Sequence, residues 1–234
     1  MDIEELKQTL EKWVHSLQPE NESFLRARLS SLKSAFPFNE YEYILMFLLD
    51  KSVISLGDYE ELRESYVQSN KYLPLYEISP RVFGQIWAEQ HIIDIDSRFQ
   101  KPSRSLDPDY AGNYDLWIEG IRVEAKASRA VDQRTRGPIV TKSLRFASGK
   151  PFWMNFQQIK VEMCDVFIFI GVWVDEIRYW VMSDSEVKSH PGLSHQHAGG
   201  IEYQIGLTNR NIEEFDKYLV DATQLGDIVL QKGR

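Results

Sequence analysis

The chain is poor in cysteine, in long apolar runs and in positive charge. Among its 234 residues there is one cysteine, Cys164. An internal disulfide and a zinc site built from several thiolates are therefore excluded, and we expect a small buried thiol in a reducing, cytoplasmic compartment. The longest apolar run, Val166–Val174, is far below the roughly 20 residues that span a bilayer. The acidic N-terminus is unlike a secretory signal.

The net charge of −8 argues against a protein that coats nucleic acid over its whole surface. The charge is unevenly distributed, however. Residues 121–150 contain eight basic side chains against two acidic ones, a local charge of +6. A positive cleft on an acidic body attracts phosphate locally and limits non-specific binding elsewhere. A solvated, charged loop is the alternative interpretation of this segment.

The chain length predicts one domain, or one domain with a small appendage. A hydrophobic content of 43% is enough to build a buried core. Apolar residues at helical spacing predict helices through most of the first 70 residues, with a capping-box pattern at Asn39 and Glu42 and a further start near Asp58. We therefore expect a helical N-terminal subdomain over residues 1–75 and a second unit over residues 76–234.

The most specific pattern lies at residues 113–127. Two alternating runs, Tyr114–Ile118 and Ile121–Ala127, flank the dipeptide Glu119-Gly120, which predicts a β-hairpin with a two-residue turn. Such a turn fixes the register, so Asp115 should face Glu124, with Lys126 on the same face as Glu124. The opposite face should be core, and it carries Tyr114, Leu116, Ile118, Ile121, Val123 and Ala125.

Two carboxylates directly opposite each other, with Cβ atoms roughly 5 Å apart, destabilise a sheet. A bound Mg²⁺ would offset the repulsion, since this hard ion is held by one or two carboxylates plus water and substrate phosphate. Lys126 could then orient a water nucleophile or neutralise charge on a phosphate. The alternative is a solvated sheet face with a salt bridge between Glu124 and Lys126.

Asp115 followed by Glu124-Ala125-Lys126 resembles the active-site motif of the PD-(D/E)xK nuclease superfamily, and the chain as a whole looks like a type II restriction endonuclease. Tyr114, not proline, precedes the aspartate. A literal Pro108-Asp109 lies upstream, but we prefer Asp115, because it falls inside the hairpin opposite Glu124, and we take Asp109 as a turn residue.

The resemblance implies an α/β (α+β) fold with a restriction-endonuclease-like αβββαβ core, a mixed sheet flanked by helices. A helix over residues 81–93 would supply Glu89 as a further metal ligand. Pro138–Phe146 is expected to be the third strand, Phe156–Met163 a helix, Val166–Val174 a central strand buried on both faces, and Ile177–Met182 its return strand. A further strand is expected near residues 201–207 and a closing helix near residues 211–220.

The resemblance also implies Mg²⁺ as cofactor, with Mn²⁺ as a substitute, held by Asp115, Glu124 and the Ala125 carbonyl. A glutamine near the site is common in such enzymes, and Gln157 or Gln158 fits that part. Candidate DNA contacts are the basic and amide side chains of the basic segment and of a polar loop further on: Arg129, Arg134, Arg136, Lys142, His195, Gln196 and His197.

We therefore expect a Mg²⁺-dependent endonuclease that cuts double-stranded DNA at a short specific sequence. A homodimer is expected for palindromic sites, and a cognate DNA methyltransferase would accompany a restriction enzyme. Two alternatives remain open at this point. One is a repair or junction-processing nuclease with the same fold, and the other is a catalytically inactive DNA-binding protein.

Overall fold

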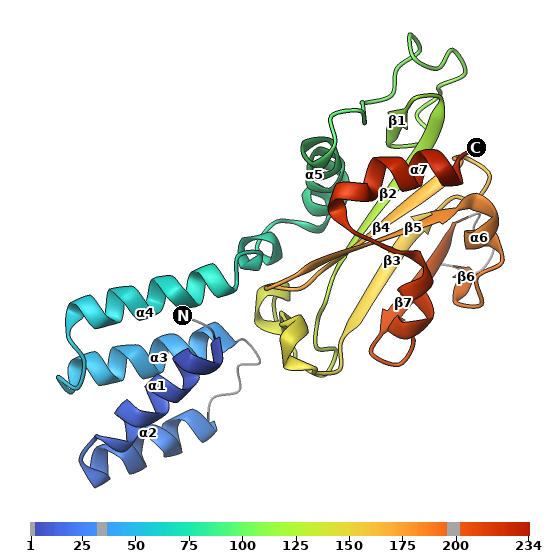
Figure 1. Ribbon diagram of the computed structural model, residues 1–234. Helices are drawn as coiled ribbons and strands as arrows, with labels where there is room; N and C mark the ends of the chain where they lie inside the picture. Colours follow the sequence, from blue (N-terminus) through green and yellow to red (C-terminus); the bar gives the residue numbers. More distant parts are fainter. Residues whose placement is uncertain (1–2, 32–36, 196–201) are drawn as a thin grey trace.

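The computed structural model describes residues 3–31, 37–195 and 202–234. The protein is α/β: N-terminal helices precede a mixed sheet, and a second, smaller antiparallel sheet packs against it (Figure 1). Within the described ranges, every helix lacks the length or the apolar character that crossing a membrane requires.

The N-terminal helices pack around a core of their own, separate from the sheets (Figure 1). They are α1 (Ile3–His15), α2 (Pro19–Ser31), α3 (Pro37–Asp50) and α4 (Leu56–Ser69). The helix expected to start at Asp58 begins earlier. Ser55 is its N-cap, and Asp58 returns a hydrogen bond to the Ser55 backbone in a capping box. The buried residues of this core run from Leu10 to Tyr66.

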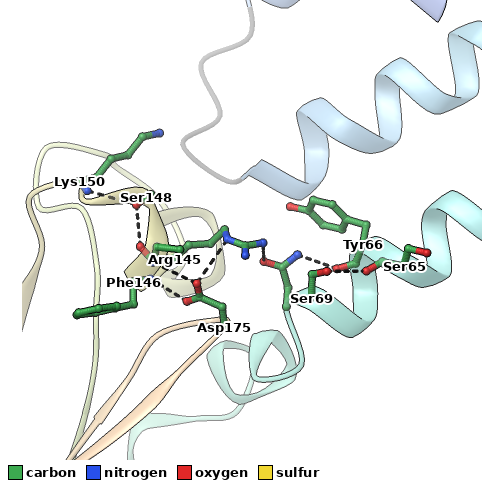
Figure 2. Close-up of polar contacts among 10 residues, drawn as sticks. Ser65, Tyr66, Ser69, Arg145, Phe146, Ser148, Lys150 and Asp175 are labelled. Atoms are coloured by element: carbon green, nitrogen blue, oxygen red, sulfur yellow. Dashed lines mark hydrogen bonds and ion pairs between the residues drawn. The ribbon is translucent and has the colours of Figure 1, made fainter. Parts of the chain in front are cut away.

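A buried polar network links α4 to the sheet-bearing part of the chain (Figure 2). Asn70 donates to the Tyr66 carbonyl at 2.7 Å and accepts from Arg145 Nη1 at 3.1 Å. Arg145 also pairs with Asp175, whose carboxylate accepts two backbone N–H groups of the segment after Arg145. Because Asn70 is 3% exposed, its amide has to be satisfied by protein, and Arg145 completes that requirement.

The main sheet has five strands in the order β1-β2-β4-β5-β8. Its bounds are β1 (Leu116–Ile118), β2 (Ile121–Arg129), β4 (Val166–Val172), β5 (Ile177–Ser183) and β8 (Leu219–Val220). Strands β2 and β4 run parallel, and the other neighbours are antiparallel. The expected central strand and its return strand are thus confirmed as β4 and β5.

Strand β4 is buried along its whole length, because a layer covers each of its faces. Ile168 and Ile170 belong to the core shared with α5 (Ala88–Ile95) and α7 (Leu225–Lys232). Phe167 and Phe169 point the other way, into the core shared with the second sheet. The main sheet is therefore the middle layer of three.

The second sheet has the order β3-β7-β6, with β3 at Trp153–Ile159, β7 at Tyr203–Thr208 and β6 at Leu193–His195. This corrects two expectations. Pro138–Phe146 contains a 3₁₀ turn, η3 (Ile139–Lys142), in place of a third strand. The segment Phe156–Met163, expected to be a helix, starts within β3 and is not helical. Met154 and Phe156 of this strand are buried against the main sheet and alternate with more exposed neighbours, as in a strand with one buried face.

The remaining elements are short. A π-helical turn, η2 (Val82–Trp87), leads directly into α5, so the helix expected over residues 81–93 is present. The closing helix expected near residues 211–220 is a 3₁₀ helix, η5 (Ile212–Tyr218), and not an α-helix. The others are η1 (Leu73–Tyr76), η4 (Phe146–Ser148), α6 (Asp184–Lys188) and η6 (Ala222–Gln224).

Candidate active site

The hairpin β1–β2 has the expected register. Ile118 pairs with Ile121, Trp117 with Arg122 and Leu116 with Val123. The turn residues Glu119 and Gly120 have φ angles of 45° and 95°. A two-residue turn with positive φ at both positions matches the twist of the strands, and glycine adopts it without steric cost.

Asp115 lies just outside the ladder, which ends at Leu116. Its backbone N–H donates to the Val123 carbonyl at 3.1 Å, and its carboxylate accepts the Ala125 N–H at 3.0 Å. The side chain is thus fixed against β2 by a hydrogen bond and not by strand pairing. Tyr114 is buried, but in the other core, where its hydroxyl donates to Asp107 at 2.9 Å. The expected core face therefore begins at Leu116.

Glu124 and Lys126 project from the same face of β2, toward the second sheet. The Lys126 Nζ lies 2.5 Å from Glu124 Oε1, and the two side chains are 16% and 9% exposed. Burial raises the pKa of Glu124 to about 7; the Lys126 ammonium opposes this shift and the nearby Asp115 charge adds to it. The site therefore holds a carboxylate whose ionisation depends on a cation nearby.

The ligands that the site offers suit a small hard cation. The Ala125 N–H binds Asp115, and in a strand the N–H and C=O of one residue point to the same edge, so the Ala125 carbonyl also faces the Asp115 side. Two carboxylates and one carbonyl are the oxygen set that Mg²⁺ takes, with water and substrate phosphate completing the shell. Within the described ranges, groups of three or more His, Cys, Asp or Glu suited to a metal are absent.

These residues lie in a cleft of about 930 Å³ between β2, β3 and the start of η2. Asp115, Glu124 and Lys126 line it together. Its walls also carry Arg81, Arg129, Lys142 and Lys160, so basic side chains outnumber acidic ones around the two carboxylates. Such a cleft attracts an anionic chain.

Glu89 does not reach the other carboxylates directly. It lies on α5 and forms an ion pair with Lys101, and it is not among the residues that line the cleft. Lys101 in turn is close enough to Asp115 to feel its charge, which partly offsets the lowering of the Lys101 pKa by burial. The structure thus connects Glu89 to Asp115 through a lysine.

The four basic residues expected to contact DNA are placed differently from one another. Arg129 lines the cleft but is largely buried: its Nη1 donates to the carbonyls of Leu75 and Ile78, and its guanidinium lies over the Phe83 ring. Arg134 is 80% exposed and pairs with Asp132. Arg136 is exposed, and Lys142 lines the cleft.

The polar residues expected near the site also lie in different places. Gln157 and Gln158 both line the cleft, but from strand β3 and not from a helix. His195 is exposed on β6, where its ring lies 4.4 Å from that of Tyr203, and it does not line the cleft. Gln196 and His197 lie outside the described residues.

Several residues near the site escaped the sequence analysis. Lys160 and Arg81 line the cleft, and Lys160 helps to lower the pKa of Glu124. Asp107, and not the neighbouring Asp109, is the buried loop aspartate, and it pairs with Arg122 at 2.8 Å. Lys160 could have been proposed from the sequence, because it is a basic residue directly after Ile159. The sequence does not show which of Asp107 and Asp109 is buried.

Comparisons with protein-family models, with curated proteins and with solved structures gave no match.

Metal affinity is expected to depend on pH through Glu124. Because a metal binds the carboxylate and the raised pKa of about 7 keeps a proton there, Mn²⁺ binding should release a proton below pH 7. We expect the dissociation constant to rise by up to about tenfold for each pH unit below 7. Calorimetry between pH 5.5 and 8 in buffers of different ionisation enthalpy measures both quantities.

In the metal-free protein the same shift acts on stability. The pKa of Glu124 is higher folded than unfolded, so its contribution is fully present below about 4.5 and is lost as pH rises through about 7. Glu124→Gln is the matched control and should remove both pH dependences. A Mn²⁺ affinity that stays constant from pH 5.5 to 8 in the native sequence would contradict this role for Glu124.

Proposed function

We propose that the chain is a Mg²⁺-dependent nuclease that hydrolyses phosphodiester bonds of double-stranded DNA, of the type II restriction endonuclease kind. The observation that carries the proposal is the convergence of Asp115, Glu124 and Lys126 in one basic cleft, with Lys126 Nζ 2.5 Å from Glu124. Two carboxylates close together on one sheet face repel each other, and a bound cation would offset that repulsion together with Lys126.

Each residue has a chemical task in this reaction. Asp115, Glu124 and the Ala125 carbonyl would hold the ion, which supplies Lewis-acid stabilisation of the scissile phosphate and of the leaving oxygen. Lys126 holds the attacking water by a hydrogen bond and places its positive charge beside the phosphate oxygens. Arg81, Lys142 and Lys160 bind the neighbouring phosphates along the cleft.

The fold supports the proposal in part. A helix (α5) precedes the hairpin, and β2, which carries Glu124 and Lys126, pairs in parallel with the buried strand β4, as an αβββαβ core requires. Two features depart from that core. Strand β3 belongs to the second sheet, and the described residues between β3 and β4 contain no helix.

The test is digestion of a large mixed-sequence DNA by the purified protein, with Mg²⁺ and with a chelator. We expect discrete fragments that require Mg²⁺, because a sequence-specific nuclease cuts at a limited set of sites. A smear would indicate a non-specific or structure-specific nuclease. Intact DNA with Mg²⁺ and with Mn²⁺ would refute the proposal for unmodified duplex.

A further inference from the structure

Strand β3 of the second sheet lies along the cleft, and β7 is its neighbour in that sheet. Along β3, Met154 and Phe156 are buried in the core, so Asn155 and Gln157 project on the opposite side, and both line the cleft. The strand then bulges, with Gln158 at a φ of 57°, and Ile159 returns to the core. The bulge keeps two successive glutamine side chains at the cleft.

A pair of amides on this face is fixed side by side. Asn155 Nδ2 donates to Gln204 Oε1 of the neighbouring strand β7 at 3.0 Å. Within the part of the chain that the structure describes, the Asn155 Oδ1 and the Gln204 Nε2 have no protein partner. The pair thus keeps one acceptor and one donor for a ligand, and the adenine edge in the major groove offers the matching groups, because N6 donates and N7 accepts.

This face is tied directly to the catalytic strand. The Asn155 backbone N–H donates to Ser128 Oγ at 3.0 Å, and Ser128 follows Lys126 by two positions on the same face of β2. At the start of β3, Trp153 also exchanges two backbone hydrogen bonds with Val131, which follows β2. The amides and Lys126 are therefore held by one continuous hydrogen-bonded unit.

We propose that the outward face of β3 and β7 is a base-reading surface that selects duplex sites containing adenine through Asn155, Gln157 and Gln204. The inference rests on the proposed function and adds to it the residues that would select the DNA sequence. The major groove, about 12 Å wide, admits a two-stranded β-ribbon, and asparagine and glutamine are the side chains that pair bidentately with adenine. Lys142 and Lys160, on the walls of the same cleft, bind the flanking phosphates and set the position of the ribbon.

The test uses a library of duplexes with a randomised central segment, cut in Mg²⁺ and sequenced at the cut ends. For the native chain we expect a motif near the cut that includes at least one A·T pair. In Gln157→Ala the preference at one position should fall by roughly 5- to 150-fold, the range that one bidentate amide–adenine contact supplies. Gln204→Ala should relax a different position, because it disrupts the Asn155 pair.

Asn209→Ala is the matched control, since this exposed amide lies just beyond the end of β7 and does not line the cleft. It should leave the motif unchanged. Thermal melting of each variant tests whether the fold persists. Because Gln157 is exposed, its replacement should change the stability of the protein least.

The outcomes separate the inference from the function on which it rests. A motif that survives unchanged in both glutamine variants overturns the base-reading surface. Cleavage of the library by the native chain with no motif overturns it as well, and leaves the nuclease proposal standing. A library that stays uncut in Mg²⁺ and Mn²⁺ refutes the nuclease proposal, and the inference falls with it.

Discussion

Replacing Lys126 with alanine is expected to lower the rate of DNA cleavage in Mg²⁺ by about 10³-fold. The expected loss follows from removing one preorganised donor and its charge from beside the phosphate, a change that costs roughly 10²- to 10³-fold in other active sites. The side chain is only 16% exposed and has the Glu124 carboxylate beside it, so water cannot replace it well. Single-turnover cleavage of a defined duplex measures the effect.

DNA binding in Ca²⁺ should change much less than the rate in Lys126→Ala, because the other cations of the cleft still hold the backbone. Lys188→Ala is a suitable control, since Lys188 pairs with Asp184 and Glu162 and does not line the cleft. A Lys126→Ala protein that cuts within tenfold of the native rate would contradict the assigned role.

Replacing Phe169 with alanine is expected to lower the free energy of unfolding by about 3–5 kcal/mol, the usual cost of removing a fully buried aromatic ring. Phe169 is 0% exposed at the centre of β4. Its ring is stacked on Phe167 at 6.0 Å and meets Phe156 edge-on at 5.1 Å, so it joins the two sheets. Chemical denaturation followed by tryptophan fluorescence measures the loss.

The effect of Phe169→Ala should reach the active site as well. Phe169 is the direct pairing neighbour of Lys126 across the β2–β4 ladder, so the two side chains are neighbours on the same face of the sheet. Phe24→Ala is the matched control, because that ring is 60% exposed and should cost no more than about 1 kcal/mol. Equal losses for the two variants would show that the two-faced burial of β4 does not dominate stability.

The sequence predicted those parts of the fold that local chemistry determines. The two-residue turn at Glu119-Gly120 allowed only one register, and the uninterrupted apolar run of β4 allowed only burial on both faces. The convergence of Asp115 with Glu124 and Lys126 followed from that register. Asp115 nevertheless lies one residue before β1: its N–H donates to the Val123 carbonyl and its carboxylate accepts the Ala125 N–H, a detail that depends on where the ladder ends.

The parts that sequence analysis missed depend on long-range packing. In β3 the bulge adds one residue, Gln158, so the buried residues Phe156 and Ile159 are three positions apart. That spacing is typical of a helix and not of a strand. The strand forms because β7, some fifty residues later, supplies its partner. Arg129 was expected to contact DNA, and the structure adds that its Nη1 donates to the carbonyls of Leu75, in η1, and of Ile78, just after it, which nothing local in the sequence indicates.

The basic segment is much less charged in effect than its composition indicates. Arg122, Arg134 and Arg145 are paired with aspartates, Arg129 binds carbonyls, and Lys126 binds Glu124. Of its eight basic side chains, only Arg136, Lys142 and Lys150 lack such partners among the described residues. The release of condensed counterions scales with the number of phosphates neutralised, about 0.9 ions for each. The basic segment by itself would therefore release few counterions, and Arg81 and Lys160, which lie outside it on the walls of the cleft, would have to add to the phosphate contacts.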